Sequence, residues 1–227
     1  MSRYACVLFD LDGTLLDTER GVMTSIDDTI EKLGFPQLSP EIKKTFVGPP
    51  IFESFQRCYG LSDKDATRAQ NHFREVYPQK HLFEAQRYDG MDELLAGLKA
   101  DGVLLGVATN KPQAYAIPLL EHFGFQAYFD VMLGSQAPRL NNKADVVREC
   151  LMLLGVADPR RAVLVGDTMH DQRGAEQSGV DFLAVSYGFG FTAGDTAQAV
   201  NAVAMCADPQ AVAAFLKKAI GRKDSIR

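Results

Sequence analysis

Two aspartates near the N-terminus are spaced so that both can act at one point. The apolar run at residues 5–9 is followed by Asp10, Asp12, Gly13 and Thr14. Residues two apart in an extended segment point to the same side, so both carboxylates can converge just past a buried strand. Neighbouring anions repel each other unless a cation lies between them, and Mg²⁺ prefers such oxygen ligands. Gly13 would let the backbone turn sharply and present N–H groups to an anionic ligand. The same residues could also form only a polar turn.

Further polar side chains follow the later apolar runs. The groups just past these expected strands are Thr109, Asn110, Lys111, Lys143, Asp167 and Asp171. Carboxylates, a hydroxyl and a lysine at one sheet edge suit a divalent cation together with a phosphate. Lys143 is expected near the start of a helix, where the helix dipole disfavours a cation, so a site role and a structural role both stay open. Thr109 could equally cap the helix that opens at Pro112.

The order of the expected elements brings these groups together. From Gly90 onward strands and helices alternate, which predicts a Rossmann-like α/β fold with a parallel sheet covered on both faces. In such sheets, ligands bind beyond the carboxyl ends of the strands. Strands are expected at residues 103–108, 131–133, 162–165, 182–185 and 202–206. Helices are expected at residues 91–100, 143–154 and 170–178, from Pro112, and after a cap at Asp208 and Pro209.

A long insertion separates the first strand from the second. About ninety residues lie between them, where one crossover helix needs only ten or so beyond its loops. Helical patterns occur at residues 19–33, 51–59 and 63–82, Ser39 is a candidate N-cap before Pro40, and no convincing strand is present. We therefore expect a helical domain at residues 16–86, and a core domain formed by residues 1–15 and 87–227. The charged residues after Gly221 are expected to fray.

Composition limits the classes of partner. The 227 residues are 46% hydrophobic and 23% charged, which is ordinary for a soluble globular protein. A net charge of -5 gives no long-range attraction to nucleic acid or to anionic membranes, so a phosphate ligand must be held locally. Four scattered cysteines without a CxxC spacing suit a reducing compartment, and no apolar run approaches a bilayer span. We expect a cytoplasmic monomer or homodimer that acts on a small molecule, with no nucleic-acid polymer and no membrane as partner.

Four segments, taken in order, resemble the motifs of the haloacid dehalogenase (HAD) superfamily of phosphohydrolases. They are DLDGTLLD from Asp10 to Asp17, the strand ending in Thr109, Lys143, and GDTMHD from Gly166 to Asp171. The helical insertion is similar to the C1 cap of the phosphoglycolate phosphatase-like branch. Within that branch, FVGPP from Phe46 and YGFG from Tyr187 resemble a subgroup described as 5'-nucleotidase-like. The resemblance implies Mg²⁺-dependent hydrolysis of a small phosphomonoester of the phosphoglycolate or nucleoside 5'-monophosphate type.

The resemblance also implies roles for single residues. Asp10 would be the nucleophile that forms an aspartyl-phosphate, and Asp12 would be the general acid and base. Mg²⁺ would bind the Asp10 carboxylate, the Asp12 backbone carbonyl and Asp167, with Asp171 bound directly or through water. The residues implied in binding the phosphoryl group are Gly13, Thr14, Thr109, Asn110 and Lys143. The cap would close over the site and exclude water other than the attacking one.

Other functions of the same fold fit the residues less well. Dehalogenases of the superfamily need no second acid, so Asp12 argues against dehalogenation. Phosphosugar mutases usually carry valine where this chain has Thr14, which favours a phosphatase and leaves the mutase as the alternative. A catalytically silent binding module would have no use for clustered carboxylates, which cost stability. The GFG sequence at residues 188–190 lacks the full GxGxxG of a dinucleotide site, and the four dispersed histidines form no metal-ligand pattern.

Overall fold

The chain divides into two compact units. The computed structural model describes residues 3–137, 139–140 and 142–221. One unit, here called the core unit, contains Met1–Leu16 and Arg87–Arg227, and the other, the helical unit, contains Asp17–Gln86. The first segment of the core unit ends at Leu16, one residue after the expected end at residue 15. The tail expected to fray after Gly221 lies outside the described residues.

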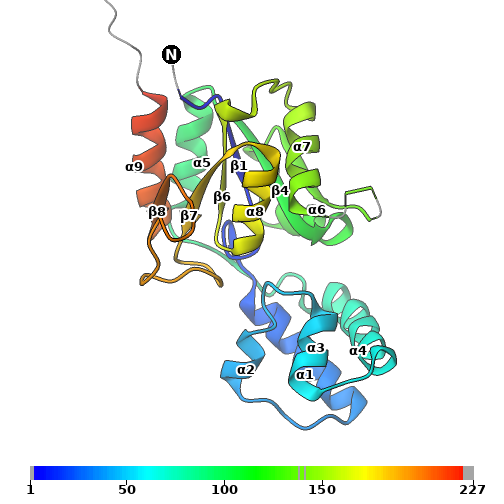
Figure 1. Ribbon diagram of the computed structural model, residues 1–227. Coiled ribbons are helices and arrows are strands. Elements are labelled where there is room, and N and C mark those ends of the chain that lie inside the picture. The colour runs from blue at the N-terminus through cyan, green and yellow to red at the C-terminus, as the bar shows by residue number, and fades with distance from the viewer. Residues whose placement is uncertain (1–2, 138, 141, 222–227) are drawn as a thin grey trace, which may run out of the picture. The chain divides into compact units, whose positions relative to one another are not determined.

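A six-stranded parallel sheet organises the core unit (Figure 1). Its strand order is β5-β4-β1-β6-β7-β8, and every neighbouring pair is parallel. The strands are β1 (Cys6–Phe9), β4 (Leu104–Pro112), β5 (Val131–Ser135), β6 (Ala162–Gly166), β7 (Asp181–Val185) and β8 (Ala204–Cys206). β1 and β6 lie inside the sheet and are buried along their whole length, as their unbroken apolar sequences require. The predicted α/β fold with a parallel sheet is confirmed.

Helices cover both faces of this sheet. They are α5 (Met91–Ala100), α6 (Gln113–His122), α7 (Lys143–Leu153), α8 (Met169–Ser178) and α9 (Pro209–Ile220), with short 3-10 turns at Phe125–Ala127 and Pro159–Arg161. α5 packs against α9 and α7 packs against α8, and Figure 1 shows the two pairs on opposite faces. α6, α7, α8 and α9 each follow a strand of this sheet, so these strand ends and the first helical turns meet at one edge.

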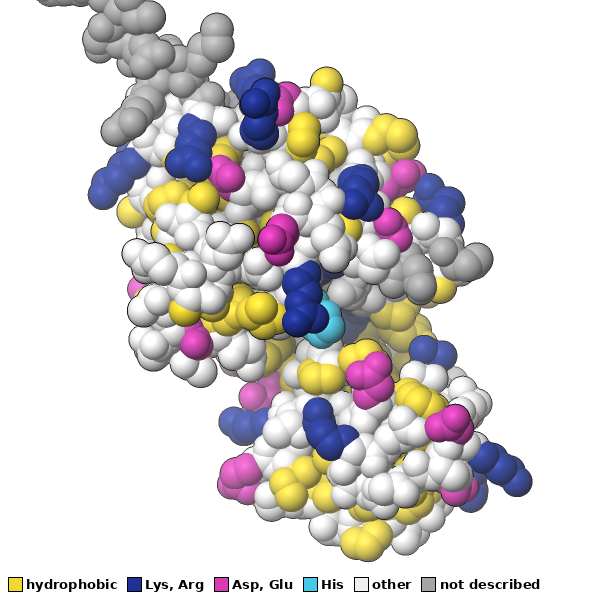
Figure 2. Space-filling view, viewed as in Figure 1, with side chains coloured by type: hydrophobic (Ala, Val, Ile, Leu, Met, Phe, Trp, Pro, Cys, Tyr) yellow, Lys and Arg dark blue, Asp and Glu magenta, His cyan; other side chains and the backbone are white. Residues whose placement is uncertain are grey.

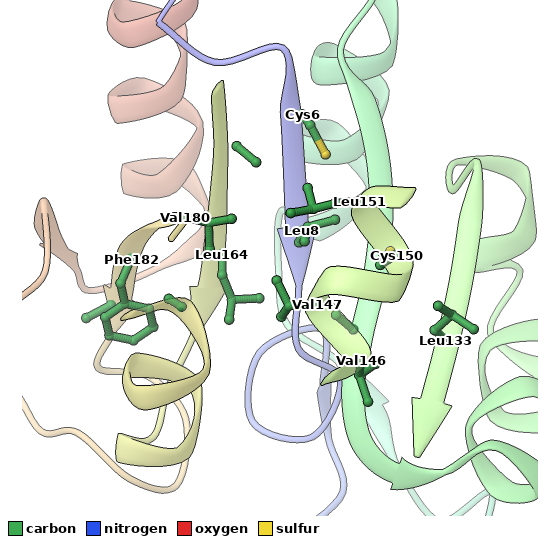
Figure 3. Close-up of a cluster of buried hydrophobic side chains, with 14 of the residues drawn as sticks. Cys6, Leu8, Leu133, Val146, Val147, Cys150, Leu151, Leu164, Val180 and Phe182 are labelled. Atoms are coloured by element: carbon green, nitrogen blue, oxygen red, sulfur yellow. The ribbon is translucent and has the colours of Figure 1, made fainter. Parts of the chain in front are cut away.

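A buried apolar cluster fixes α7 and α8 on the sheet. Leu8 and Leu164 of the sheet face Val147 and Leu151 of α7, as Figure 3 shows. All four side chains are at most 5% exposed. Burial of a side chain of this size stabilises the fold by about 1.5–3 kcal/mol, so the cluster holds the first residues of α7 and α8 in place against the sheet.

The structure differs from the expected end of β4. The apolar run stops at Ala108, but the strand continues to Pro112, with a shift of register in between. Ala108 pairs with Leu133 and Pro112 pairs with Ser135, so residues 109–111 bulge opposite the single residue 134. Thr109, Asn110 and Lys111 therefore lie within an irregular part of the strand and not after it. The last strand is also shorter than expected and begins at Ala204.

The helical unit contains four α-helices. They are α1 (Glu19–Leu33), α2 (Pro40–Lys44), α3 (Ile51–Tyr59) and α4 (Asp63–Val76). α4 packs against both α1 and α3. The side chain of Ser39 accepts a hydrogen bond from the Ile42 N–H, so the predicted N-cap before Pro40 is confirmed.

Two features of this region differ from expectation. The helix predicted to reach residue 82 ends at Val76 and continues as one π-helical turn, η1 (Tyr77–His81). Pro78 explains the change, because it has no N–H for the regular bond to the carbonyl four residues earlier. Two short strands that the sequence pattern did not indicate, β2 (Leu16–Asp17) and β3 (Gln86–Arg87), pair as a separate two-stranded sheet.

Charged side chains of both signs are scattered over the face seen in Figure 2. This mixture agrees with the small net charge and differs from the basic stripe typical of nucleic-acid-binding proteins. Within the described part of the chain, every helix is too short or too polar to cross a bilayer.

Candidate active site

Three buried carboxylates converge at the carboxyl ends of β1 and β6. Asp10 follows β1, Asp167 follows β6, and Asp171 lies in the first turn of α8. One ligand atom from each lies within 4.8 Å of the other two. β1 and β6 are parallel neighbours, so their ends necessarily share one edge of the sheet. The structure thus brings together three of the side chains that sequence analysis proposed for the site.

Lys143 lies between two of these carboxylates. It is the first residue of α7 and its side chain is only 4% exposed. Its Nζ is 2.5 Å from Asp10 Oδ1 and 2.6 Å from Asp171 Oδ1, and it donates a hydrogen bond to the Ala108 carbonyl at 2.9 Å. Burial alone would lower the pKa of Lys143, but Asp10 and Asp171 outweigh it and raise that pKa. The two carboxylates therefore hold an ammonium group at a helix N-terminus, where the helix dipole opposes it.

The cluster carries more negative than positive charge. Burial, reinforced by Asp171 and opposed by Lys143, raises the pKa of Asp10 to about 6. Burial and the nearby Asp171 and Asp10 carboxylates raise the pKa of Asp167 to about 8. A divalent cation bound to these oxygens would neutralise the excess charge, and a hard oxygen donor set of this kind suits Mg²⁺.

A helix cap orients Asp171. Thr168, the N-cap of α8, donates from its N–H and its hydroxyl to Asp171 Oδ2 at 3.0 Å and 2.6 Å. The Asp171 N–H donates in return to the Thr168 hydroxyl, which completes a capping box. One carboxylate oxygen is thereby used in the cap, and the other lies beside Lys143.

A glycine-rich loop holds Asp167. The N–H groups of Phe189 and Gly190 donate to Asp167 Oδ2 at 2.7 Å and 3.3 Å, and the Thr14 hydroxyl donates to Oδ1 at 3.3 Å. A Cβ atom at Gly13 or Gly188 would clash with the Asp167 carboxylate. Gly13 also has a φ of 80°, which residues with a side chain rarely adopt. The two glycines leave the space that the carboxylate occupies.

Asp12 is not one of the three clustered carboxylates. Its side chain is 24% exposed and forms an ion pair with Lys111, whose Nζ lies 2.9 Å from Asp12 Oδ1. β1 ends at Phe9, and the alternation of side chains expected for Asp10 and Asp12 holds only in extended backbone. Asp10 and Asp12 therefore have different lysine partners.

The remaining predicted residues lie at the same ends of β1 and β4. Thr109 is buried, and its hydroxyl accepts a hydrogen bond from the Lys111 N–H at 3.1 Å. Pro112 takes the N-cap position of α6, so Thr109 does not cap that helix. Asn110 is exposed and Thr14 is buried.

A family model described as haloacid dehalogenase-like hydrolase matches residues 7–185. The chain belongs to this family. The matched segment includes Asp10, Lys143, Asp167 and Asp171. The superfamily resemblance drawn from the motifs is therefore confirmed.

Matches to two similar proteins cover nearly the whole chain. A 5'-nucleotidase of Pseudomonas aeruginosa is 35% identical over 216 residues, which is 95% of this chain and 96% of that protein. The solved structure of a haloacid dehalogenase-like hydrolase from Streptococcus pneumoniae superposes with a TM-score of 0.86 at 30% identity, and the match covers 95% of this chain and 99% of that chain.

One similar protein is named as a kinase and not as a phosphatase or nucleotidase. The tyrosine-protein kinase PtkA of Mycobacterium tuberculosis is 36% identical over 185 residues, and the match covers 81% of this chain. It covers only 62% of PtkA, so the present chain spans less than two thirds of that protein.

Sequence reasoning assigned no individual role to three contributors to the HAD-like site. Lys111 pairs with Asp12, the loop at residues 188–190 holds Asp167, and Tyr187 donates from its hydroxyl to the Thr14 carbonyl at 3.0 Å. Lys111 carried a usable signal, because it follows an apolar run and its charge is opposite to that of the nearby aspartates. The GFG loop carried none, because its approach to Asp167 depends on the pairing of β6 with β7.

Proposed function

We propose that this HAD-like hydrolase is a Mg²⁺-dependent phosphatase that cleaves a small phosphomonoester through an aspartyl-phosphate on Asp10. The observation that carries the proposal is the Asp10 carboxylate, which is buried at the end of β1 and paired with Lys143 at 2.5 Å. A carboxylate held in this way can act as a nucleophile, and the ammonium group beside it screens its charge from an incoming phosphate dianion.

The residues around Asp10 supply the other steps. Asp10 attacks phosphorus and the bond to the leaving oxygen breaks, while Asp12 donates a proton to that oxygen. Asp12 then takes a proton from water, which attacks phosphorus and releases inorganic phosphate and free Asp10. Lys143, the Thr109 hydroxyl and N–H groups near Gly13 and Asn110 stabilise the phosphoryl oxygens throughout.

Asp10, Asp167 and Asp171 would hold the metal ion, together with the Asp12 backbone carbonyl. The excess negative charge of the three carboxylates, seen in the raised pKa values of Asp10 and Asp167, supports this assignment. A bound Mg²⁺ would neutralise negative charge on the phosphoryl group and on these carboxylates. Lys143 balances only part of the charge.

We propose that the substrate is a nucleoside 5'-monophosphate or a small phosphorylated acid such as phosphoglycolate. The 5'-nucleotidase relative, which matches over nearly the full length, supports the first class. The helical unit would act as the cap that selects the substrate, as its insertion directly after the first motif suggests. A phosphosugar mutase remains the alternative, and a catalytically silent module is a weaker one.

The proposal is tested by hydrolysis of 4-nitrophenyl phosphate with and without Mg²⁺. We expect Asp10→Asn to lower kcat about 10³-fold or more, because it removes the nucleophile. Asp101→Asn, at an exposed carboxylate after α5, is the matched control and should keep the wild-type rate. Equal rates for wild type and Asp10→Asn would overturn the proposal.

A substrate panel then separates the alternatives. It contains nucleoside monophosphates, phosphoglycolate and hexose phosphates. Preferred release of phosphate from one class would support the phosphatase. Conversion of one hexose phosphate isomer into another would identify the mutase.

A further inference from the structure

We propose that Lys111 is a positioning residue for Asp12, and that its ammonium group holds the Asp12 carboxyl group in place for proton transfer to the leaving oxygen. The inference rests on the proposed function, in which Asp12 is the general acid. Lys111 would act through Asp12 and would not itself touch the phosphoryl group.

The contact between the two side chains is close and largely enclosed. Lys111 Nζ lies 2.9 Å from Asp12 Oδ1, and the lysine side chain is only 7% exposed. A surface ion pair gains little because both side chains move freely in water. A lysine this deeply enclosed has few alternative positions for its ammonium group. It can therefore fix the direction of the Asp12 carboxylate.

The backbone of Lys111 is held from two sides. Its N–H donates to the Thr109 hydroxyl at 3.1 Å. Its carbonyl lies against Gly134 of β5, where a Cβ atom would clash with it, and the Gly134 N–H donates to the side chain of Gln113. The bulge of β4 between Ala108 and Pro112 thus sets the point from which the lysine side chain extends.

Lys111 and Lys143 have separate partners. Lys143 contacts Asp10 and Asp171 in the carboxylate cluster, whereas Lys111 contacts Asp12. Asp12 is more exposed than Asp10, at 24% against 10% for the two side chains, and it lies at the turn after β1. A carboxyl group in such a turn transfers a proton efficiently only if it is kept within hydrogen-bond distance of the leaving oxygen. A misplacement of about 1 Å can lower the rate about 10²-fold.

The leaving group provides a readout for this role. The 4-nitrophenolate ion is a weak base and departs without a proton, whereas the more basic phenolate of phenyl phosphate needs one in the transition state. The two substrates have almost the same shape. Loss of a positioned general acid therefore slows phenyl phosphate selectively, and a general disturbance of the site slows both substrates.

The experiment measures kcat and KM of wild type, Lys111→Met and Lys111→Gln for both substrates. We expect each variant to lower kcat/KM about 10- to 100-fold for phenyl phosphate and less than about 3-fold for 4-nitrophenyl phosphate, because kcat/KM reports only the steps up to release of the phenol. Lys111→Arg should recover part of the phenyl phosphate rate. Lys99→Met is the control, because this half-exposed lysine pairs with Asp130 away from the carboxylate cluster, and it should leave both rates unchanged.

A second comparison tests whether Lys111 acts through Asp12. Asp12→Asn should show the same selective loss of kcat/KM, with a loss of kcat on both substrates because the base of the second step is also removed, and adding Lys111→Met should lower kcat/KM no further. An equal loss of kcat/KM on both substrates would overturn the proposal, as would a full additional loss of kcat/KM in the double variant. Failure of the proposed function looks different, because wild type and Asp10→Asn would then hydrolyse 4-nitrophenyl phosphate equally.

Discussion

Four aspartates in one small region differ in chemistry because each has its own partners. Asp10 contacts Lys143, Asp171 contacts Lys143 and Thr168, Asp167 accepts hydrogen bonds from backbone N–H groups, and Asp12 contacts Lys111. A carboxylate beside a lysine stays charged more readily than one surrounded by carboxylates. The distinct environments of Asp10 and Asp167 therefore match the separate roles proposed for nucleophile and metal ligand.

Replacement of Lys143 tests how much of the fold depends on this site. Lys143→Met leaves Asp10 and Asp171 buried without their cation, so we expect the free energy of unfolding to fall by about 3 kcal/mol. Urea unfolding of the metal-free protein measures the change. Arg148→Met, at a half-exposed arginine of α7, is the control. An unchanged free energy for Lys143→Met would contradict the assigned ion pairs.

The active-site side chains lie at the ends of strands and at the starts of helices. β1 and β6 end side by side, and α7 and α8 begin at the same edge, so residues far apart in sequence meet there. The loop after β7 adds the N–H groups that hold Asp167. Outer groups of this kind commonly change metal affinity 10- to 100-fold when they are altered.

A substitution at Gly188 tests whether this loop positions Asp167 for metal binding. A Cβ atom there would clash with the Asp167 carboxylate, so Gly188→Ala should weaken Mg²⁺ binding at least about 10-fold in calorimetric titrations. Gly194→Ala is the matched control, because a Cβ atom at that position meets only Thr192 Oγ1 at 3.7 Å. Identical Mg²⁺ titrations for the two variants would show that the loop does not position Asp167.

The sequence allowed the clustered acids to be predicted, but not the end of β4 or the contacts of the Gly188 loop. Asp10, Asp167 and Asp171 could be located because acids that follow buried parallel strands share one sheet edge. The end of β4 was missed because its pairing continues through a bulge after the apolar run stops at Ala108. The contacts of the Gly188 loop depend on tertiary packing, which no local pattern reveals.

At the scale of the whole molecule, the helical unit has its own charged network. His81 Nδ1 is 2.7 Å from Glu84 Oε1, and its Nε2 is 3.2 Å from Asp28 Oδ2. Burial alone would lower the pKa of His81, but the hydrogen bonds to Glu84 and Asp28 outweigh it and raise that pKa. The network makes the stability of this unit depend on pH.

The sign of that dependence follows from the raised pKa. The stabilisation is fully present below the unfolded-state pKa of His81, about 6.5, and is lost as the pH rises through the higher folded-state pKa. We therefore expect His81→Gln to lower the free energy of unfolding by about 1 kcal/mol at low pH, and by less as the pH rises. Urea unfolding followed by circular dichroism at several pH values measures this, with His122→Gln as control. A loss that does not vary with pH would contradict the prediction.

The position of β1 between β4 and β6 delays its pairing during synthesis. Cys6 pairs with Leu104 on one side and with Ala162 on the other, so β1 leaves the ribosome before both of its neighbours and cannot pair until they are made. The helical unit is continuous in sequence and can fold during this interval. Until β6 emerges, the apolar β1 keeps an unpaired edge, which is the condition under which nascent chains aggregate. β1, which Asp10 directly follows, therefore needs protection during synthesis.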